Sequence, residues 1–129
     1  MASKLFLSLS VLAISACASA GTNSGVHRDY NLITESEITQ QNGNDAYDVI
    51  SHLRPNFLKT RGRTSIQTPP SPTSEYASVF LDSQYYGDLN TLRNIPTINI
   101  KEIRYLPANE AVTRYGMQYG NGVIEIRTR

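Results

Sequence analysis

The alternation of hydrophobic and polar residues predicts a strand followed by a helix near the end of the chain. Apolar and polar residues alternate from 98 to 106, which is typical of a strand with one buried face. Pro107 ends this run because proline has no backbone N–H to donate to a neighbouring strand. Residues 109–115 have helical composition, and Gly116 is placed to cap that helix, since glycine enters the left-handed region at little cost.

Two further strands are predicted on either side of this unit. Residues 120–122 read Gly-Asn-Gly, which favours two positive φ angles, and the β-rich run 123–126 after them is typical of a strand. Earlier in the chain, residues 77–82 predict another strand, and 83–87 predict a turn away from it. Asp88 then caps a short helix that extends to residue 93.

The N-terminal half of the domain is predicted to contain a short strand, 32–33, and two helices. Thr34 and Glu37 have the spacing of a capping box, which opens one or two helical turns. A second helix starts at residue 44 or 45 and ends before Pro55, because proline disfavours helix in the preceding residue. Its apolar face consists of Ala46, Val49, Ile50 and Leu53. These elements predict an α+β fold: a small mixed sheet of about four strands with two or three short helices.

The last segment also carries a longer ordered pattern. It reads I-x-x-I-R-Y-L-x-A-x-E-A-x-x-R-Y-G and then G-N-G-V-I-x-I-x-T-R. This order resembles the closing segment of the plug domain of TonB-dependent outer-membrane receptors. The matching residues are Ile103, Leu106, Ala108, Ala111, Tyr115, Gly116, Gly122, Val123, Ile124, Ile126 and Thr128. The resemblance extends over 32–129 except for 59–75, and it implies a stand-alone, plug-like lipoprotein without the receptor barrel.

Residues 1–16 are typical of a secretory signal peptide. Their apolar run is too short to span a bilayer, which needs about 20 apolar residues. Ile14 to Cys17 resembles a bacterial lipobox, whose cleavage leaves Cys17 as a lipidated N-terminus. Ala18 to Ala20 offers a second cleavage site, which would release a soluble periplasmic protein that begins at Gly21. We favour the lipobox because the single cysteine directly follows the small residues.

The rest of the chain divides into a tether and one domain. Residues 17–31 are polar and rich in glycine, serine and asparagine, so we expect a flexible tether. Residues 32–129 form the plug-like domain, with an exposed proline-rich loop at 68–74. Ala18 after the cysteine resembles the outer-membrane sorting pattern. The expected location is therefore the periplasmic face of the outer membrane, with the lipid as anchor.

Charge excludes one class of partner and singles out one cluster. The chain has 12 basic and 11 acidic side chains, and a basic one lies in the signal peptide, so the mature protein is near neutral and nucleic acid is not an expected ligand. One basic cluster stands out, with Phe57 and Leu58 interleaved. It consists of Arg54, Lys59, Arg61 and Arg63. Three interpretations stay open: a solvated loop anchored by Phe57 and Leu58, a contact with anionic lipid or lipopolysaccharide phosphates, and a contact with an acidic protein.

The sequence contains no signature of catalysis. Neither of its two histidines has a neighbour at the spacing of a metal site or a catalytic triad, so we expect no metal, no cofactor and no enzyme. The interpretation that remains is a non-catalytic binding or scaffolding module, associated with outer-membrane transport, whose partner is an envelope or outer-membrane protein. The alternative is a small-ligand-binding lipoprotein that uses its tyrosines. These are Tyr76, Tyr85, Tyr86, Tyr115 and Tyr119.

Overall fold

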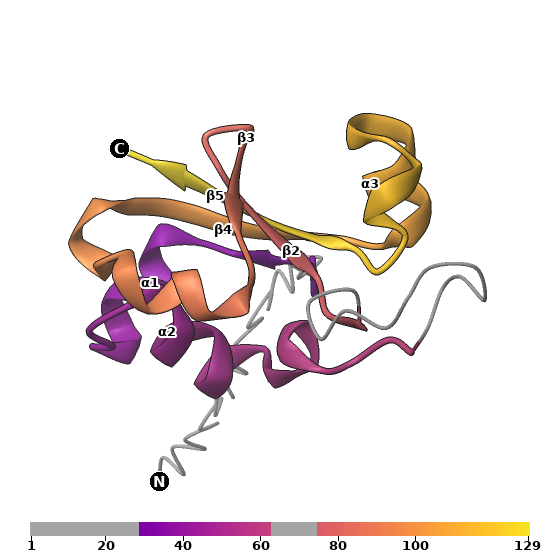
Figure 1. The fold of residues 1–129 in the computed structure, drawn as a ribbon. Coiled ribbons are helices and arrows are strands. Elements are labelled where there is room, and N and C mark those ends of the chain that lie inside the picture. Colours follow the sequence, from indigo (N-terminus) through magenta and orange to yellow (C-terminus); the bar gives the residue numbers. More distant parts are fainter. Residues whose placement is uncertain (1–28, 63–74) are drawn as a thin grey trace, which may run out of the picture.

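The computed structural model describes residues 29–62 and 75–129 (Figure 1). Within these ranges the chain forms one five-stranded sheet packed with helices, which confirms the predicted α+β class. The strands are β1 (Leu32–Ile33), β2 (Ser78–Leu81), β3 (Gln84–Gly87), β4 (Ile100–Leu106) and β5 (Val123–Thr128). The predicted signal peptide with Cys17, most of the tether, Arg63 and the proline-rich loop at 68–74 lie outside the described residues.

The sheet is mixed, and its last strand in sequence lies in its middle. The strand order is β1-β4-β5-β2-β3. Strand β5 pairs antiparallel with β4, where Ile126 lies opposite Ile103, and parallel with β2, where Ile124 lies opposite Val79. The two outer strands, β1 and β3, pair antiparallel with β4 and β2.

Helices lie on both sides of the sheet, but they cover the two faces unequally (Figure 1). The α-helices are α1 (Glu35–Gln41), α2 (Ala46–Leu53) and α3 (Ala108–Tyr115). The short 3₁₀ helices are η1 (Pro55–Leu58), η3 (Leu89–Asn94), η4 (Thr97–Asn99) and η5 (Met117–Tyr119). Helices α1 and α2 lie below the sheet in this view, whereas α3 stands above one end of β4 and β5.

Side chains alternate across the strands, so each face of the sheet has its own core. The larger cluster lies against α1, α2, η1 and η3 and includes Val49, Leu92, Ile103, Ile124 and Ile126. The smaller one lies beneath α3 and consists of Phe80, Leu106, Ala111 and Val123, with Tyr115 and Tyr119 packed against it. Because α3 covers only one end of the upper face, the remainder of that face is open.

The predicted boundaries of the first two helices are confirmed. The Thr34 backbone N–H donates to the Glu37 carboxylate at 3.0 Å, as the capping box requires. The Asp45 side chain accepts from the Asp48 backbone N–H at 2.9 Å and so caps α2. Helix α2 then ends at Leu53, two residues before a proline.

The prediction that residues 83–87 only turn the chain is wrong. Gln84–Gly87 is strand β3, joined to β2 by a two-residue hairpin turn in which Asp82 has φ 47° and Ser83 has φ 70°. Positive φ angles at both central residues define a type I′ turn, whose twist matches that of the two antiparallel strands. Its usual sequences have glycine at the second position, where this chain has serine, so the hairpin has no clear sequence signal.

The predicted glycine turn before β5 also differs in detail. Gly120 has φ −63°, and only Gly122 of the three turn residues has a positive φ, of 92°. The residues before Gly120 form η5 (Met117–Tyr119), and none of them has a positive φ. Gly116 ends α3 with the expected positive φ of 110°, but its ψ of 166° places it outside the left-handed helical region.

Candidate functional site

One row of side chains crosses the open face of the sheet. In the strand register, Tyr85 lies opposite Phe80, Phe80 lies opposite Glu125, and Glu125 lies opposite Arg104. The row thus changes from aromatic to acidic to basic over four neighbouring strands. We call the surface around it the open face, and define it by Phe80, Glu102, Arg104, Arg114, Glu125 and Arg127.

Glu125 is the buried centre of this face, with 1% of its surface exposed. Its carboxylate accepts from Arg114 Nη1 at 3.0 Å, from the Tyr115 hydroxyl at 3.2 Å and from the Ser83 hydroxyl at 3.3 Å, and Arg127 Nε lies 3.9 Å away. Burial raises the pKa of Tyr115, and the nearby Glu125 carboxylate raises it further against the opposing effect of Ser83. The Tyr115 phenol therefore stays protonated and able to donate at neutral pH.

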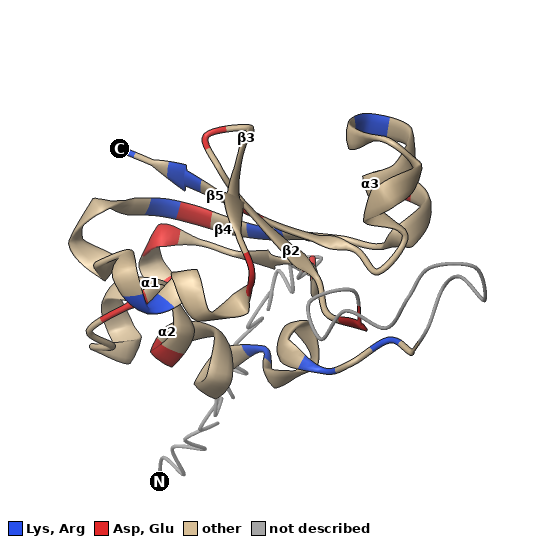
Figure 2. Ribbon diagram, viewed as in Figure 1, with Lys and Arg blue, Asp and Glu red and all other residues tan. Residues whose placement is uncertain are grey.

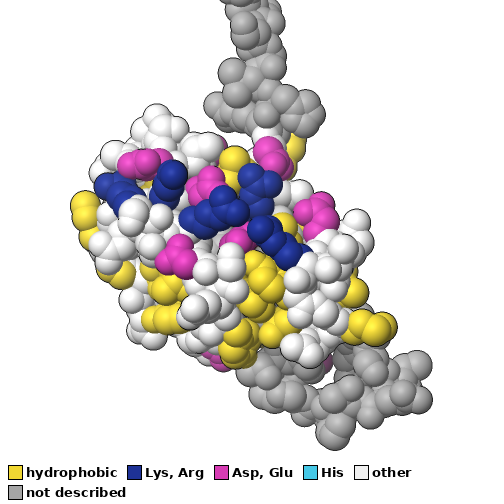
Figure 3. Space-filling view, turned by 90° about the horizontal axis from the view of Figure 1, so that it is seen from above, with side chains coloured by type: hydrophobic (Ala, Val, Ile, Leu, Met, Phe, Trp, Pro, Cys, Tyr) yellow, Lys and Arg dark blue, Asp and Glu magenta, His cyan; other side chains and the backbone are white. Residues whose placement is uncertain are grey.

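Arginine side chains surround the buried carboxylate and reach solvent. Arg114 and Arg127 have 46% and 48% of their side chains exposed, and Arg127 also pairs with Glu102 at 3.1 Å. Arg104 is partly exposed and makes no ion pair with any other described residue. Figure 2 shows blue segments on β4, β5 and α3, and Figure 3 shows Lys and Arg side chains gathered over this side of the molecule, with yellow hydrophobic surface beside them. The sequence analysis did not single out any of these arginines.

An aromatic cluster adjoins the charged part of the open face. The Phe80 ring lies 4.1 Å from the Tyr115 ring, 5.1 Å from Tyr119 and 5.8 Å from Tyr85, measured between centroids. Tyr85 is 62% exposed, so the cluster reaches the surface. The structure thus brings together three of the five tyrosines singled out in the sequence. The other two, Tyr76 and Tyr86, are exposed and have no ring contact among the described residues.

Arg54, from the basic cluster predicted in the sequence, is used inside the domain. Its guanidinium pairs with Glu37 at 3.1 Å and donates to the Tyr30 backbone carbonyl at 3.2 Å. Burial of the Glu37 carboxyl opposes ionisation, but hydrogen bonds from Thr34 and Arg54 outweigh it and lower the pKa of Glu37. The pair thus connects α1 to the end of α2, which leaves Arg54 less able to bind a partner.

Arg61, a second member of that cluster, also contacts a residue of the domain. Arg61 lies over the Tyr105 ring at 5.0 Å, and Phe57 stacks on Tyr105 with 4.9 Å between ring centroids. This places Phe57 in the core, as the solvated-loop interpretation requires. Lys59 is exposed and has no ion pair among the described residues, and Arg63 lies outside them.

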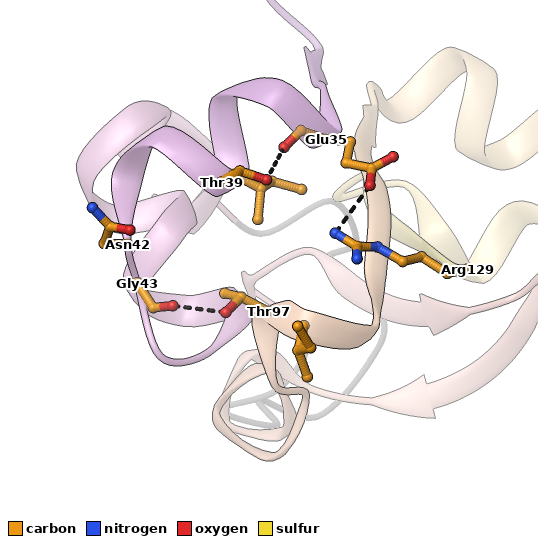
Figure 4. A pocket seen from close by; sticks show the side chains of 8 residues that line it. Glu35, Thr39, Asn42, Gly43, Thr97 and Arg129 are labelled. Carbon is orange, nitrogen blue, oxygen red and sulfur yellow. Dashed lines mark hydrogen bonds and ion pairs between the residues drawn. The ribbon is translucent and has the colours of Figure 1, made fainter.

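A separate hollow of about 530 Å³ lies at the far end of the domain from α3 (Figure 4). It is lined by Glu35, Ile38, Thr39, Asn42, Gly43, Thr97, Ile98 and Arg129. Arg129 pairs with Glu35 at 3.0 Å on one side of it, and the Thr97 hydroxyl donates to the Gly43 carbonyl at 2.7 Å on the other. None of the tyrosines lines this hollow, so it is distinct from the aromatic cluster.

The strained turn of the β2–β3 hairpin is bonded to the end of β5. The Asp82 carboxylate accepts from the Thr128 backbone N–H at 2.9 Å and from its hydroxyl at 2.7 Å. These two bonds lower the pKa of Asp82 below its ordinary value of 3.8. Ser83 reaches Glu125 from the same turn. The left-handed backbone of these two residues therefore directs both side chains toward β5.

We expect the folded protein to lose stability in acid as Asp82 is protonated. A carboxyl whose pKa is lowered by folding binds fewer protons in the folded state than in the unfolded state. Its contribution to the free energy of unfolding is therefore fully present above the ordinary pKa of 3.8, and it is lost as the pH falls through the lower pKa of the folded state. Because Asp82 is exposed, solvent screening makes this contribution small. Urea titrations between pH 2 and pH 7 should show a shallower acid loss for Asp82→Asn than for wild type. Equal slopes would contradict the prediction, and Asp88→Asn serves as a control away from Thr128.

Within residues 29–62 and 75–129 no three His, Cys, Asp or Glu side chains approach closely enough to hold a metal ion. In the same part of the chain no helix is long and apolar enough to cross a membrane. Searches for similar proteins, against family descriptions, curated proteins and solved structures, found no match to this chain.

Proposed function

We propose that this chain is a non-catalytic binding module of the bacterial envelope, and that an acidic segment of a protein partner docks on its open face. The observation that carries the proposal is the combination on one surface of three arginines and a partly exposed aromatic cluster. Arg104, Arg114 and Arg127 all reach solvent there. Arginine and tyrosine are the residue types enriched in protein interfaces, since both bury apolar area and still form hydrogen bonds.

The charge balance of the open face favours an acidic partner. Glu125 is buried and already has four donors around it, and Glu102 is paired with Arg127. Arg104 has no such partner among the described residues, so its charge is available to a ligand. Complementary charge of this kind speeds association and fixes the orientation of the partner. The aromatic rings beside these charges offer apolar area that a partner can bury, which adds a hydrophobic contribution to the electrostatic attraction.

The envelope location belongs to the same proposal and is supported by the sequence alone. The lipobox resemblance makes Cys17 the lipidated residue, with the domain on the periplasmic face of the outer membrane. The resemblance to receptor plug domains makes an outer-membrane transport protein the first partner to look for. Mass spectrometry of the mature N-terminus distinguishes a lipidated Cys17 from a soluble protein that begins at Gly21.

Photo-crosslinking from the aromatic cluster tests the docking surface directly. Tyr85 is replaced by p-benzoylphenylalanine, a change of one aromatic ring for another at a side chain that is 62% exposed. In intact cells we expect one dominant crosslinked envelope protein, identified by mass spectrometry. The same substitution at Tyr30, which is 78% exposed at the other edge of the sheet, should not capture it. Equal capture from both positions would contradict the proposal.

A pair of matched charge removals then separates the two basic surfaces. Arg104→Gln in the Tyr85 crosslinking background should lower the crosslinked yield about tenfold, because it removes one unpaired charge from the interface. Lys59→Gln removes one unpaired charge from the other cluster and should leave the yield within about twofold. The reverse result would place the partner on the Lys59 loop. The effect of Arg104 should also weaken as salt is raised, since salt screens exposed charges.

A further inference from the structure

The far end of the domain from α3 carries an exposed hydrophobic side chain between two hollows. Ile98 in η4 is 70% exposed, so its side chain projects from the surface. It lines both the hollow of about 530 Å³ shown in Figure 4 and an adjoining one of about 410 Å³. The second hollow is lined by Ile98, Asn99, Thr128 and Arg129. A protruding apolar residue and the depressions that could receive it therefore share one patch.

The charges of this patch are balanced as well. Among the described residues that line the two hollows, only Glu35 and Arg129 are charged, and they pair with each other at 3.0 Å. Their side chains are 51% and 44% exposed, so each has capacity for a second partner of opposite sign. Figure 4 shows this pair on one side of the hollow, with Asn42, Gly43 and Thr97 around the rest of it.

A surface with a protruding side chain, a hollow and one charge of each sign is complementary to a copy of itself. Under a two-fold rotation the same patch faces itself, so residue i contacts residue j while j contacts i. Ile98 of each copy then enters the hollow of the other. Arg129 of each copy comes close to Glu35 of the other, and the four charges alternate in sign. An acidic or a basic partner would leave one of the two charges facing its own sign.

We infer that the patch formed by Glu35, Thr97, Ile98 and Arg129 is the contact surface between two copies of this chain. The patch shares none of the residues that define the open face, and it begins where β5 continues from Arg127 to Thr128 and Arg129. The patch is small, and a small interface associates weakly. The lipid anchor proposed above would raise the local concentration of the chain at the membrane.

Sedimentation and thiol crosslinking test the dimer. In sedimentation equilibrium the wild-type chain should show an average mass that rises with concentration toward twice that of one chain. Ile98→Asp should remain at the mass of one chain, and Met117→Asp should behave as wild type, because Met117 is 89% exposed on η5 and outside the patch. With Cys17→Ser as background, oxidised Ile98→Cys should give a disulfide dimer on a non-reducing gel, and Met117→Cys should not.

Exchanging the charges tests the geometry of the contact. Glu35→Arg or Arg129→Glu alone should weaken association at least tenfold, and the double exchange should restore it, because opposite charges again face each other. Thermal melting of each variant shows whether the fold is intact. A wild-type chain that stays at the mass of one chain at every concentration would overturn the inference. So would equal crosslinking from Ile98→Cys and Met117→Cys, or a double exchange that restores nothing.

Discussion

Replacing Gly122 with alanine should destabilise the protein by about 4 kcal/mol. Gly122 has φ 92°, a backbone conformation that costs a residue with a side chain about 1–3 kcal/mol. An added Cβ would in addition collide with the Tyr105 hydroxyl and lie 2.9 Å from the Leu106 carbonyl. Both belong to the buried strand β4, so relieving the clash must shift a core strand, at about 1–3 kcal/mol. Urea unfolding followed by circular dichroism measures the loss.

Gly116 provides a matched control for that substitution. It also has a positive φ, of 110°, but a Cβ added there would have no neighbour within 4 Å. Gly116→Ala should therefore show the backbone cost alone, about 1–3 kcal/mol. Adding Tyr105→Phe to Gly122→Ala removes the hydroxyl that the alanine meets, and should recover part of the stability. Equal losses for the two glycines, with no recovery from Tyr105→Phe, would show that the contact with β4 does not matter.

Arg114→Met should destabilise the protein by about 2 kcal/mol by leaving Glu125 without its closest cation. Removing one partner of a fully buried ion pair costs about 3–5 kcal/mol, because the remaining charge stays buried and uncompensated. Here we expect less, since Arg114 is 46% exposed and Arg127 remains 3.9 Å from the carboxylate. Helix α3 should also loosen from the sheet. Hydrogen exchange of its backbone amides measures this second effect.

Two further variants distinguish a buried charge from a simple loss of contacts. The double change Arg114→Met with Glu125→Leu removes both charges and fills the space, so it should be more stable than Arg114→Met alone. Arg127→Met breaks a pair in which Arg127 is 48% and Glu102 23% exposed, and it leaves Arg114 beside Glu125, so it should cost only about 1 kcal/mol. A double variant no better than Arg114→Met would show that the Arg114 side chain contributes by packing rather than by charge.

Much of the fold could be predicted because its signals are local. The capping box at Thr34 marks the start of α1. The apolar face of α2 and the proline after Arg54 mark the extent and the end of α2. The alternation in β4 and the β-branched run of β5 have the same local character. The hairpin at Asp82 and Ser83 was missed because serine there gives no signal for a positive φ. Its left-handed backbone is maintained by bonds from both side chains to β5, more than 40 residues away in sequence.

The candidate site could not be predicted in the same way, because it depends on the register between distant strands. Phe80, Arg104 and Glu125 become neighbours only after β2, β4 and β5 pair, and no local pattern gives that register. One clue was present: Glu125 interrupts the apolar run 123–126, and a carboxylate requires partners if such a strand is buried. Conversely, the cluster around Arg54 stood out because its members are close in sequence. In the fold, the side chains of Arg54 and Arg61 are committed to Glu37 and Tyr105.

The central position of β5 has a consequence for biosynthesis. Residues 123–128 join β4 to β2, and without them the sheet separates into two unconnected strand pairs. During translation these residues leave the ribosome after all the strands that they connect. The five-stranded sheet should therefore form only after residues 123–128 have been synthesised.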